Sequence, residues 1–139
     1  MKRAFKIIDH TADVGIVAYG NDIEELFANA ALALFSLIAE PGNVEASLRF
    51  DLEVCGNDRE SLLVAWLNEL IYLFDVERIL FSRFEIESAD QVSIKAACYG
   101  EHFDPMKHHM KTGVKAATYH MLELDRNGDA YRAQIILDI

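Results

Sequence analysis

The sequence predicts an α+β fold in which two helices are inserted into a mostly antiparallel β-sheet or sandwich. Two segments carry apolar residues at helical spacing, and most of the remaining chain alternates apolar and polar residues with the period of a strand. The chain has 139 residues, with no internal repeat and no linker, as is typical of one domain. We therefore expect residues 1–139 to form a single domain with the element order β-β-α-β-α-β-β-β-β.

Both predicted helices begin at an asparagine that precedes a glutamate by three positions, a spacing typical of a capping box. The first begins at Asn21, with Glu24 as partner, and Pro41-Gly42 ends it. The second begins at Asn57, with Glu60 as partner. Apolar residues spaced by three and four predict core-facing stripes: Ile23, Leu26, Phe27, Ala30, Leu34, Leu37 and Ile38 in the first helix, and Leu63, Trp66, Leu67, Leu70, Ile71 and Phe74 in the second.

Alternation of apolar and polar residues predicts the strands. It is clearest from Val44 to Val54, where the polar residues share one face and predict a strand with one solvated side. Asn127-Gly128 predicts a tight hairpin between the last two strands. The remaining predicted strands are residues 4–8, 15–20, 79–87, 91–99, 114–124 and 130–138.

The chain is acidic, with 13 basic and 23 acidic residues and a formal charge of −10. Such an excess repels nucleic-acid phosphates unless basic side chains cluster. Lys107, Lys111 and Lys115 come closest to a cluster but are too few. The charge fits a basic protein partner or bound cations better than it fits nucleic acid. The alternative is that the excess of acidic residues only keeps the protein soluble.

Three features of the sequence indicate the cellular compartment of the protein: its apolar segments, its N-terminus and its cysteines. No apolar segment approaches the roughly 20 residues of a membrane-spanning helix, and no secretory signal is visible. Cys55 and Cys98 are far apart and fit no metal-binding spacing. We expect both to be buried thiols in a reducing compartment, and hence a cytoplasmic protein with no membrane contact.

Residues 9–15, Asp9-His10-Thr11-Ala12-Asp13-Val14-Gly15, concentrate reactive side chains between two predicted strands. A carboxylate in this loop can bind Ca²⁺ or Mg²⁺ through oxygen. The alternative is that Asp13 makes a turn and His10 packs against its neighbours. The spacing alone favours the second interpretation.

The end of the chain supplies further oxygen ligands. The last predicted strand ends in Asp138-Ile139 without a polar tail, so we expect it to be held in place. If the loop of Asp13 lies against this end, two side-chain carboxylates and the C-terminal carboxylate converge and need a cation. Oxygen ligands favour Ca²⁺, Mg²⁺ or Mn²⁺ over Zn²⁺.

Four of the 5 histidines lie between residues 102 and 120. Together with Glu101 and Asp104 they suggest a zinc site, and a metal-dependent hydrolase that uses His10, His108 and His120 is one alternative function. No cysteine accompanies them, so a solvated loop is the commoner explanation. The sequence contains neither a phosphate-binding loop nor a Gly-x-Ser-x-Gly nucleophile elbow.

Taken together, residues 9–15, 61–70, 100–120 and 138–139 resemble the archease family, in order and over essentially the whole chain. The resemblance implies a non-catalytic activator of the GTP- and manganese-dependent RNA-splicing ligase. Such an activator promotes guanylylation and multiple turnover of the ligase in tRNA splicing and RNA repair. A chaperone-like modulator of a tRNA methyltransferase is an older proposal for the family, and it stays open as an alternative.

The resemblance also implies site residues. Family members carry a bound metal, typically calcium, and the corresponding ligands here are Asp13, Asp138 and Ile139. We expect contact with the ligase from His10, Glu101, His108, Lys115 and His120. Any contact with nucleic acid is expected to be weak or indirect.

Overall fold

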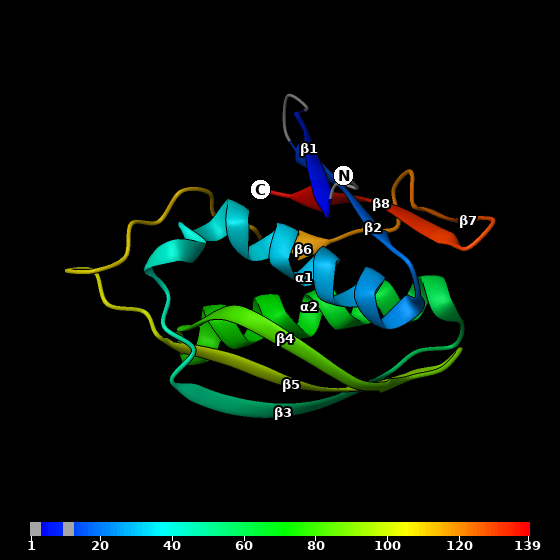
Figure 1. The fold of residues 1–139 in the computed structure, drawn as a ribbon. Helices are drawn as coiled ribbons and strands as arrows, with labels where there is room; N and C mark the ends of the chain where they lie inside the picture. The colour runs from blue at the N-terminus through cyan, green and yellow to red at the C-terminus, as the bar shows by residue number, and fades with distance from the viewer. Residues whose placement is uncertain (1–3, 10–12) are drawn as a thin grey trace.

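The structure, a computed structural model, describes residues 4–9 and 13–139. Within these residues, two antiparallel sheets enclose a layer of two helices, α1 and α2 (Figure 1). The α+β class predicted from the sequence is confirmed. The helices, however, lie between two sheets, because α1 contacts β2 of one sheet and β4 of the other. None of the described helices is long and apolar enough to cross a membrane.

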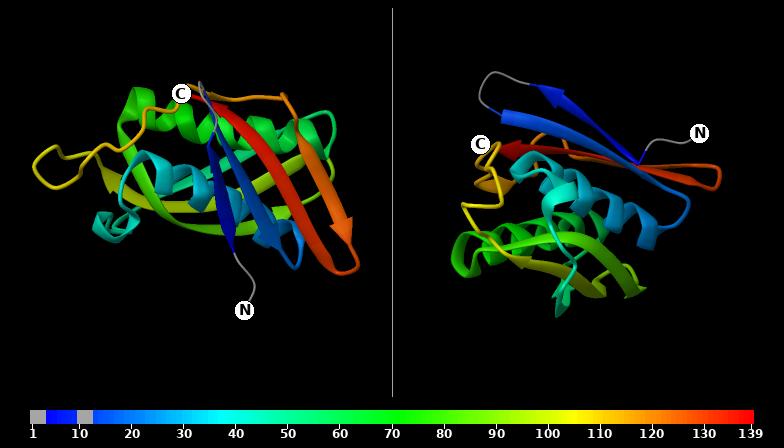
Figure 2. Two further views of the ribbon diagram at one scale, coloured as in Figure 1. Left: turned by 90° about the horizontal axis from the view of Figure 1, so that it is seen from above. Right: turned by 60° about the vertical axis from the view of Figure 1, so that its left-hand side comes forward.

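The larger sheet has β8 (Ala130–Asp138) at its centre. On one side of β8 lies β2 (Asp13–Gly20), followed by the edge strand β1 (Phe5–Asp9). On the other side, β6 (Ala116–Ala117) and β7 (Glu123–Asn127) pair with successive parts of β8. Figure 2 shows this sheet from above, with the end of the chain in its middle strand.

The smaller sheet has the order β3 (Leu48–Cys55), β5 (Ser93–His102), β4 (Ile79–Ala89). Gly100 lies beside the irregularity in the pairing of β4 with β5, between Phe81 and Arg83. A Cβ atom at Gly100 would overlap the carbonyl oxygen of Leu80, so only glycine permits this close approach of the two backbones.

Helices α1 (Ile23–Ile38) and α2 (Arg59–Glu77) each begin one residue later than the capping boxes predicted. Asp22, not Asn21, caps α1 by accepting a hydrogen bond from the Glu25 N–H. Asp58, not Asn57, caps α2 and forms a capping box with Ser61. An aspartate follows each asparagine, and its charged carboxylate accepts from the helix N-terminus more strongly than an amide oxygen.

Three further predictions need correction. The strand predicted from Val44 begins only at Leu48, after a short 3₁₀ helix, Pro41–Asn43, and an extended stretch. The strand predicted over residues 114–124 is split into β6 and β7 by a turn. Cys55 is exposed at the end of β3, whereas Cys98 is buried as expected. The predicted hairpin at Asn127-Gly128 is confirmed, with Gly128 at a φ of 65°.

The core fills the space between the sheets and includes both helices. Trp66 of α2 is fully buried and donates from its indole nitrogen to the Phe27 carbonyl oxygen of α1, at 3.0 Å. Its ring meets that of Phe84 on β4 edge to face, with 6.1 Å between centroids. One side chain thus links the two helices and the smaller sheet.

Candidate functional site

Asp13 and Asp138 are directly opposite each other on neighbouring strands. Asp13 begins β2, Asp138 ends β8, and the antiparallel register pairs the two residues. The Asp138 carbonyl oxygen accepts from the Lys115 N–H at 2.8 Å, so the backbone polar groups of Asp138 point away from β2. A cross-strand pair without mutual backbone hydrogen bonds brings its side chains closest together. The structure therefore juxtaposes the two aspartates that the sequence singled out.

This arrangement fits a divalent cation bound through oxygen. Two like charges at directly opposite positions destabilise a sheet unless a positive charge lies between them. Asp138 is exposed and Asp13 is partly exposed, with its Oδ1 buried, so a hydrated ion has access from the side of Asp138. Ca²⁺ takes about six to eight oxygen ligands. The carboxylates would supply part of that shell, and main-chain oxygens of Ile139, which is also exposed, would add to it.

The edge of the sheet next to Asp138 is held by α2. Asn68 donates from its side-chain nitrogen to the Ala117 carbonyl oxygen at 3.1 Å, and its side-chain oxygen accepts from the Ala117 N–H at 2.8 Å. The amide thus replaces the next strand of the sheet and covers an edge that would otherwise be open to pairing. It also fixes β6 where Lys115 meets Asp138.

Asn68 was missed by the sequence analysis, which treated this helix only as an apolar stripe. The signal was present, since Asn68 is a polar residue between Leu67 and Leu70 of that stripe. An amide that is even partly buried in such a position usually has a specific partner.

Glu101, Lys107 and His108 form a compact charged cluster at the end of β5. Lys107 Nζ contacts both carboxylate oxygens of Glu101, at 2.8 and 3.1 Å. The Glu45 N–H donates to the same carboxylate at 2.7 Å. His108 Nδ1 accepts from the Asp104 N–H, so the ring proton resides on Nε2, which donates to Glu101 at 3.0 Å. Burial raises the pKa of Glu101, but these hydrogen bonds outweigh it and lower the pKa to about 2.

For His108, this cluster corrects the expectation of a solvated histidine loop, whereas His102, His109 and His120 are exposed as expected. His108 is 2% exposed and stacks on Phe103, so its ring is part of the packed structure. Glu101 is largely covered as well. Both side chains are already engaged within the chain. Direct contact with a partner, as proposed from the resemblance, would require the cluster to rearrange.

The segment after His108 caps helix α1. The N–H groups of Lys111 and Thr112 donate to the carbonyl oxygens of Ile38 and Leu37, and Lys111 Nζ donates to that of Ser36. No basic residue lies in the last turn of α1 itself. Lys111 therefore supplies the positive charge that the C-terminal end of a helix favours. The chain then continues to Lys115 and the edge of the sheet.

The other predicted contact residues are dispersed. Lys115 and His120 are exposed, beside β6 and in the turn after it. His10 lies outside the described residues. Across residues 4–9 and 13–139, no group of three or more His, Cys, Asp or Glu side chains is placed to hold a metal ion.

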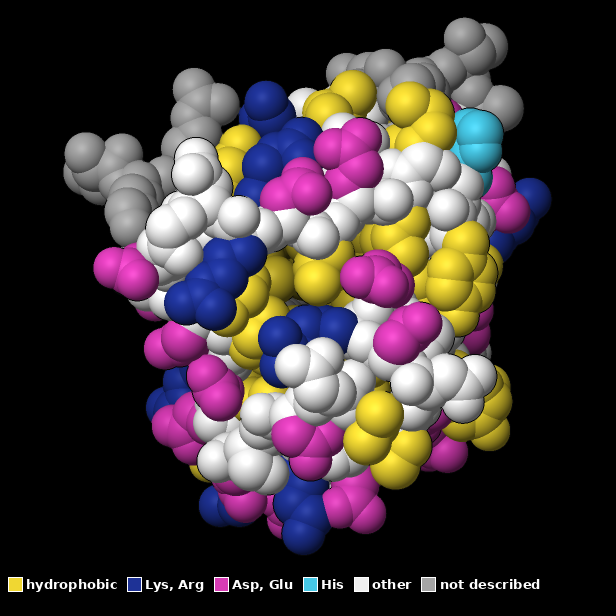
Figure 3. Space-filling model, turned by 90° about the vertical axis from the view of Figure 1, so that its right-hand side faces the viewer, with side chains coloured by type: hydrophobic (Ala, Val, Ile, Leu, Met, Phe, Trp, Pro, Cys, Tyr) yellow, Lys and Arg dark blue, Asp and Glu magenta, His cyan; other side chains and the backbone are white. Residues whose placement is uncertain are grey.

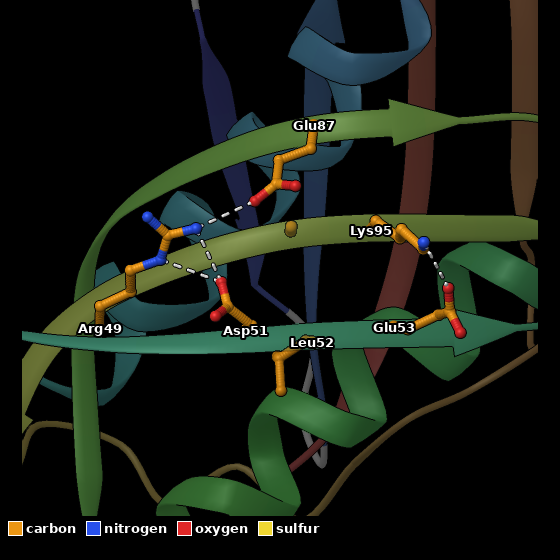
Figure 4. Close-up of a pocket in the computed structure, with 7 residues that line it drawn as sticks. Arg49, Asp51, Leu52, Glu53, Glu87 and Lys95 are labelled. Carbon is orange, nitrogen blue, oxygen red and sulfur yellow. Dashed lines mark hydrogen bonds and ion pairs between the residues drawn. The ribbon is translucent and has the colours of Figure 1, made fainter.

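Two shallow depressions lie away from the aspartate pair. One, of about 410 Å³, is on the outer face of the smaller sheet. Figure 4 shows that its charges are paired with one another: Arg49 with Asp51 and Glu87, and Lys95 with Glu53. The other, of about 400 Å³, is beside the β7–β8 hairpin and includes Tyr19 and Arg132. Because the charged side chains of the depression on the smaller sheet pair with one another, it has little net charge to attract a ligand.

Comparison with known proteins identifies relatives over the full length of the chain. Residues 5–139 match the model of the Archease protein family (MTH1598/TM1083). The protein archease of Pyrococcus furiosus is 43% identical, with 99% of each chain covered, and that of Methanosarcina acetivorans is 41% identical, with 99% of this chain and 97% of the relative covered.

Solved structures agree with this assignment. The solution structure of Methanobacterium thermoautotrophicum protein 1598 is 40% identical, covers 98% of this chain and 99% of its own, and superposes with a TM-score of 0.84. An archease and possible chaperone from Thermotoga maritima, at 21% identity and a TM-score of 0.64, shares the fold. The matched length, the identity and the common fold together establish that this chain belongs to the Archease protein family.

Proposed function

We propose that this protein activates a GTP- and manganese-dependent RNA-splicing ligase in the cytoplasm, promoting its guanylylation and its multiple turnover. The observation that carries the proposal is the register that places Asp13 opposite Asp138. It places two carboxylates, one exposed and one partly exposed, at one end of the larger sheet. Family membership supports the general role, and the acidic charge of −10 suits a partner that binds RNA through a basic surface.

In this proposal Asp13, Asp138 and the main chain of Ile139 hold a divalent cation, with calcium expected. A cation bound there would supply positive charge for the phosphate groups of a nucleotide at the docked surface. Asn68 holds β6 in place through its hydrogen bonds to Ala117. It thereby also positions the neighbouring Lys115, whose N–H donates to the Asp138 carbonyl oxygen at the end of β8. Lys115 and His120 are exposed and available to the ligase. RNA contact is indirect, since the acidic chain repels phosphate.

The metal role is tested by thermal unfolding with calcium. At a concentration of about 100 times the dissociation constant, a ligand that binds only the folded state adds about 2.7 kcal/mol of stability. We expect calcium to raise the melting temperature of the natural sequence, and Asp13→Asn or Asp138→Asn to abolish the rise. Asp129→Asn is the matched control, because Asp129 lies in the hairpin at the far end of β8. An equal rise in all variants would exclude the aspartate pair.

The ligase role is tested separately by ligation assays with the ligase encoded in the same genome. We expect the natural sequence to increase guanylylation and product formed per ligase molecule. Asp138→Asn should reduce this stimulation by at least tenfold, while Asp129→Asn should keep it. Absence of stimulation by the natural sequence would refute the activator role.

A chaperone-like role is the second candidate, favoured by exposed apolar side chains such as Met106, which is 94% exposed. A tRNA methyltransferase is the client proposed for the family. Suppression of methyltransferase aggregation, with no effect on ligation, would favour this function. A metal-dependent hydrolase would require turnover by the isolated protein.

A further inference from the structure

Two non-glycine residues in the described chain have a positive φ angle: Arg78 at 57° and Met121 at 53°. This left-handed conformation is unfavourable for residues that carry a Cβ atom, and more so for bulky ones. Arg78 follows α2, and its guanidinium stacks on Phe74 at 4.5 Å and on Phe103 at 5.0 Å. Its side chain therefore makes contacts that offset the strain.

Met121 differs, because its side chain is 53% exposed. It occupies the third position of a β-turn closed by a hydrogen bond from the Leu122 N–H to the Tyr119 carbonyl oxygen, at 3.2 Å. Glycine or asparagine is favoured at this position when φ is positive. A strained residue with an exposed apolar side chain suggests that the side chain is needed for something outside the folded core.

The turn is held firmly against β8. Thr118 donates through both its N–H and its hydroxyl to the Ile136 carbonyl oxygen, at 3.1 and 2.8 Å. Gln134, which is 9% exposed, donates to the Met121 carbonyl oxygen at 3.1 Å. Tyr119 is 62% exposed beside Met121. The turn thus presents two large apolar side chains from a rigid support, which lowers the entropic cost of docking.

The turn lies between β6 and β7, on the side of β8 opposite β2, and Asp138 of the aspartate pair is a residue of β8 itself. Met121 is joined to Gln134, which precedes Asp138 by four residues. Four residues of extended strand span about 13 Å, well within the width of an ordinary protein interface. Figure 3 shows the end of the molecule that carries the β7–β8 hairpin, where apolar side chains reach the surface among acidic and basic ones.

We propose that Tyr119 and Met121 form an apolar docking knob that inserts into an apolar pocket, framed by basic side chains, on the surface of the activated ligase. The basic frame follows from charge complementarity with a chain of net charge −10. Met121 supplies a flexible, polarisable side chain suited to such a pocket, and Tyr119 a rigid aromatic anchor. The inference rests on the proposed function, since it takes the ligase as the partner.

The test measures binding and stability in the same variants. Met121→Gly removes the side chain and the strain together, so we expect its melting temperature to rise by about 2–4 °C while its affinity for the purified ligase falls at least tenfold. Met121→Ala keeps the strain and should lose affinity without gaining stability. Met106→Ala, at another exposed methionine, should bind like the natural sequence. Affinity should also fall as salt is raised.

The outcomes separate the inference from the function on which it rests. Affinity within twofold of the natural sequence for both Met121 variants would overturn the docking knob while leaving the activator role intact. Equal loss in Met106→Ala would also overturn it, because the effect would not be specific to the turn. If the natural sequence neither binds the ligase nor stimulates it, both the proposed function and the docking knob are refuted.

Discussion

Glu101 shows how a single carboxylate can join distant parts of this chain. Its carboxylate accepts hydrogen bonds from the side chains of Lys107 and His108 in the following loop. It also accepts one from the N–H of Glu45, in the segment before β3. A carboxylate that accepts several hydrogen bonds is held in its charged form, which accounts for a pKa of about 2. Because this pKa lies below that of the unfolded chain, the cluster stabilises the fold at neutral pH. Its contribution declines as pH falls from about 4.5 towards 2.

Glu101→Gln tests this pH dependence. The substitution removes the charge that Lys107 contacts, and we expect a loss of about 2 kcal/mol in the free energy of unfolding at pH 7. The difference between variant and natural sequence should shrink as pH is lowered from 4.5 to 2.5, because the Glu101 carboxylate takes up a proton in the unfolded chain over this range while it stays largely charged in the folded protein. Urea unfolding at several pH values measures it, with the exposed Glu77→Gln as control. A difference that stays constant with pH would contradict the assignment.

At the scale of elements, the structure repeatedly completes one element with groups from another. Lys111 caps the end of α1 from a loop more than seventy residues later in the chain, and Asn68 of α2 takes the place of a strand beside β6. Strand β6 has only two residues, Ala116 and Ala117, so it owes its position to such contacts. The site next to Asp138 therefore depends on α2 as much as on the sheet.

Asn68→Ala should expose this dependence. Loss of two hydrogen bonds from a partly buried amide is expected to cost about 2 kcal/mol of stability. The Ala117 amide should exchange with deuterium much faster, and the Lys115 amide should follow it. Tyr72→Ala, at an exposed position on the same helix, serves as control and should leave both exchange rates unchanged. Unaltered protection of Ala117 in Asn68→Ala would mean that β6 is held by β8 alone.

For the whole molecule, the layer of helices between two sheets explains why α1 buries residues on several sides. Consecutive positions such as Ala33, Leu34 and Phe35 are all buried, which a helix lying on one sheet alone would not need. Trp66 joins the layers through its hydrogen bond to Phe27 and its contact with Phe84. Since one core cluster includes residues of both sheets and both helices, we expect the layers to unfold together.

Trp66→Phe probes this cooperativity. The smaller ring leaves a cavity and removes one hydrogen bond, at a cost of about 3 kcal/mol. For the natural sequence, Trp66 fluorescence and far-ultraviolet circular dichroism should report the same unfolding midpoint in urea. The variant, followed by circular dichroism, should keep one transition at lower urea with an unchanged slope. Separate transitions for the two signals would refute the expectation of a single domain.

Local sequence patterns were sufficient to predict the positions of many helices and strands, but they predicted the ends of these elements less accurately. Helical spacing located α1 and α2, and Asn127-Gly128 located the final hairpin, because each depends on interactions between near neighbours. The helix starts were misplaced by one residue, since Asp22 and Asp58 compete with the asparagines before them. The prediction of one strand over residues 114–124 was wrong, because alternation of apolar and polar residues cannot reveal a turn that distant groups hold in place. One such group is Gln134, which donates a hydrogen bond to the Met121 carbonyl oxygen.

By itself, the sequence determined the α+β class, the segments that become helices, the acidic charge and the set of candidate residues, Asp13 and Asp138 among them. Only the tertiary structure decided that these two aspartates are cross-strand neighbours, that His108 is buried against Glu101, and that Asn68 closes the sheet edge. The physical reason is the separation along the chain. Local propensity and periodicity act over a few residues, whereas these contacts join residues brought together by strand register and packing of the layers.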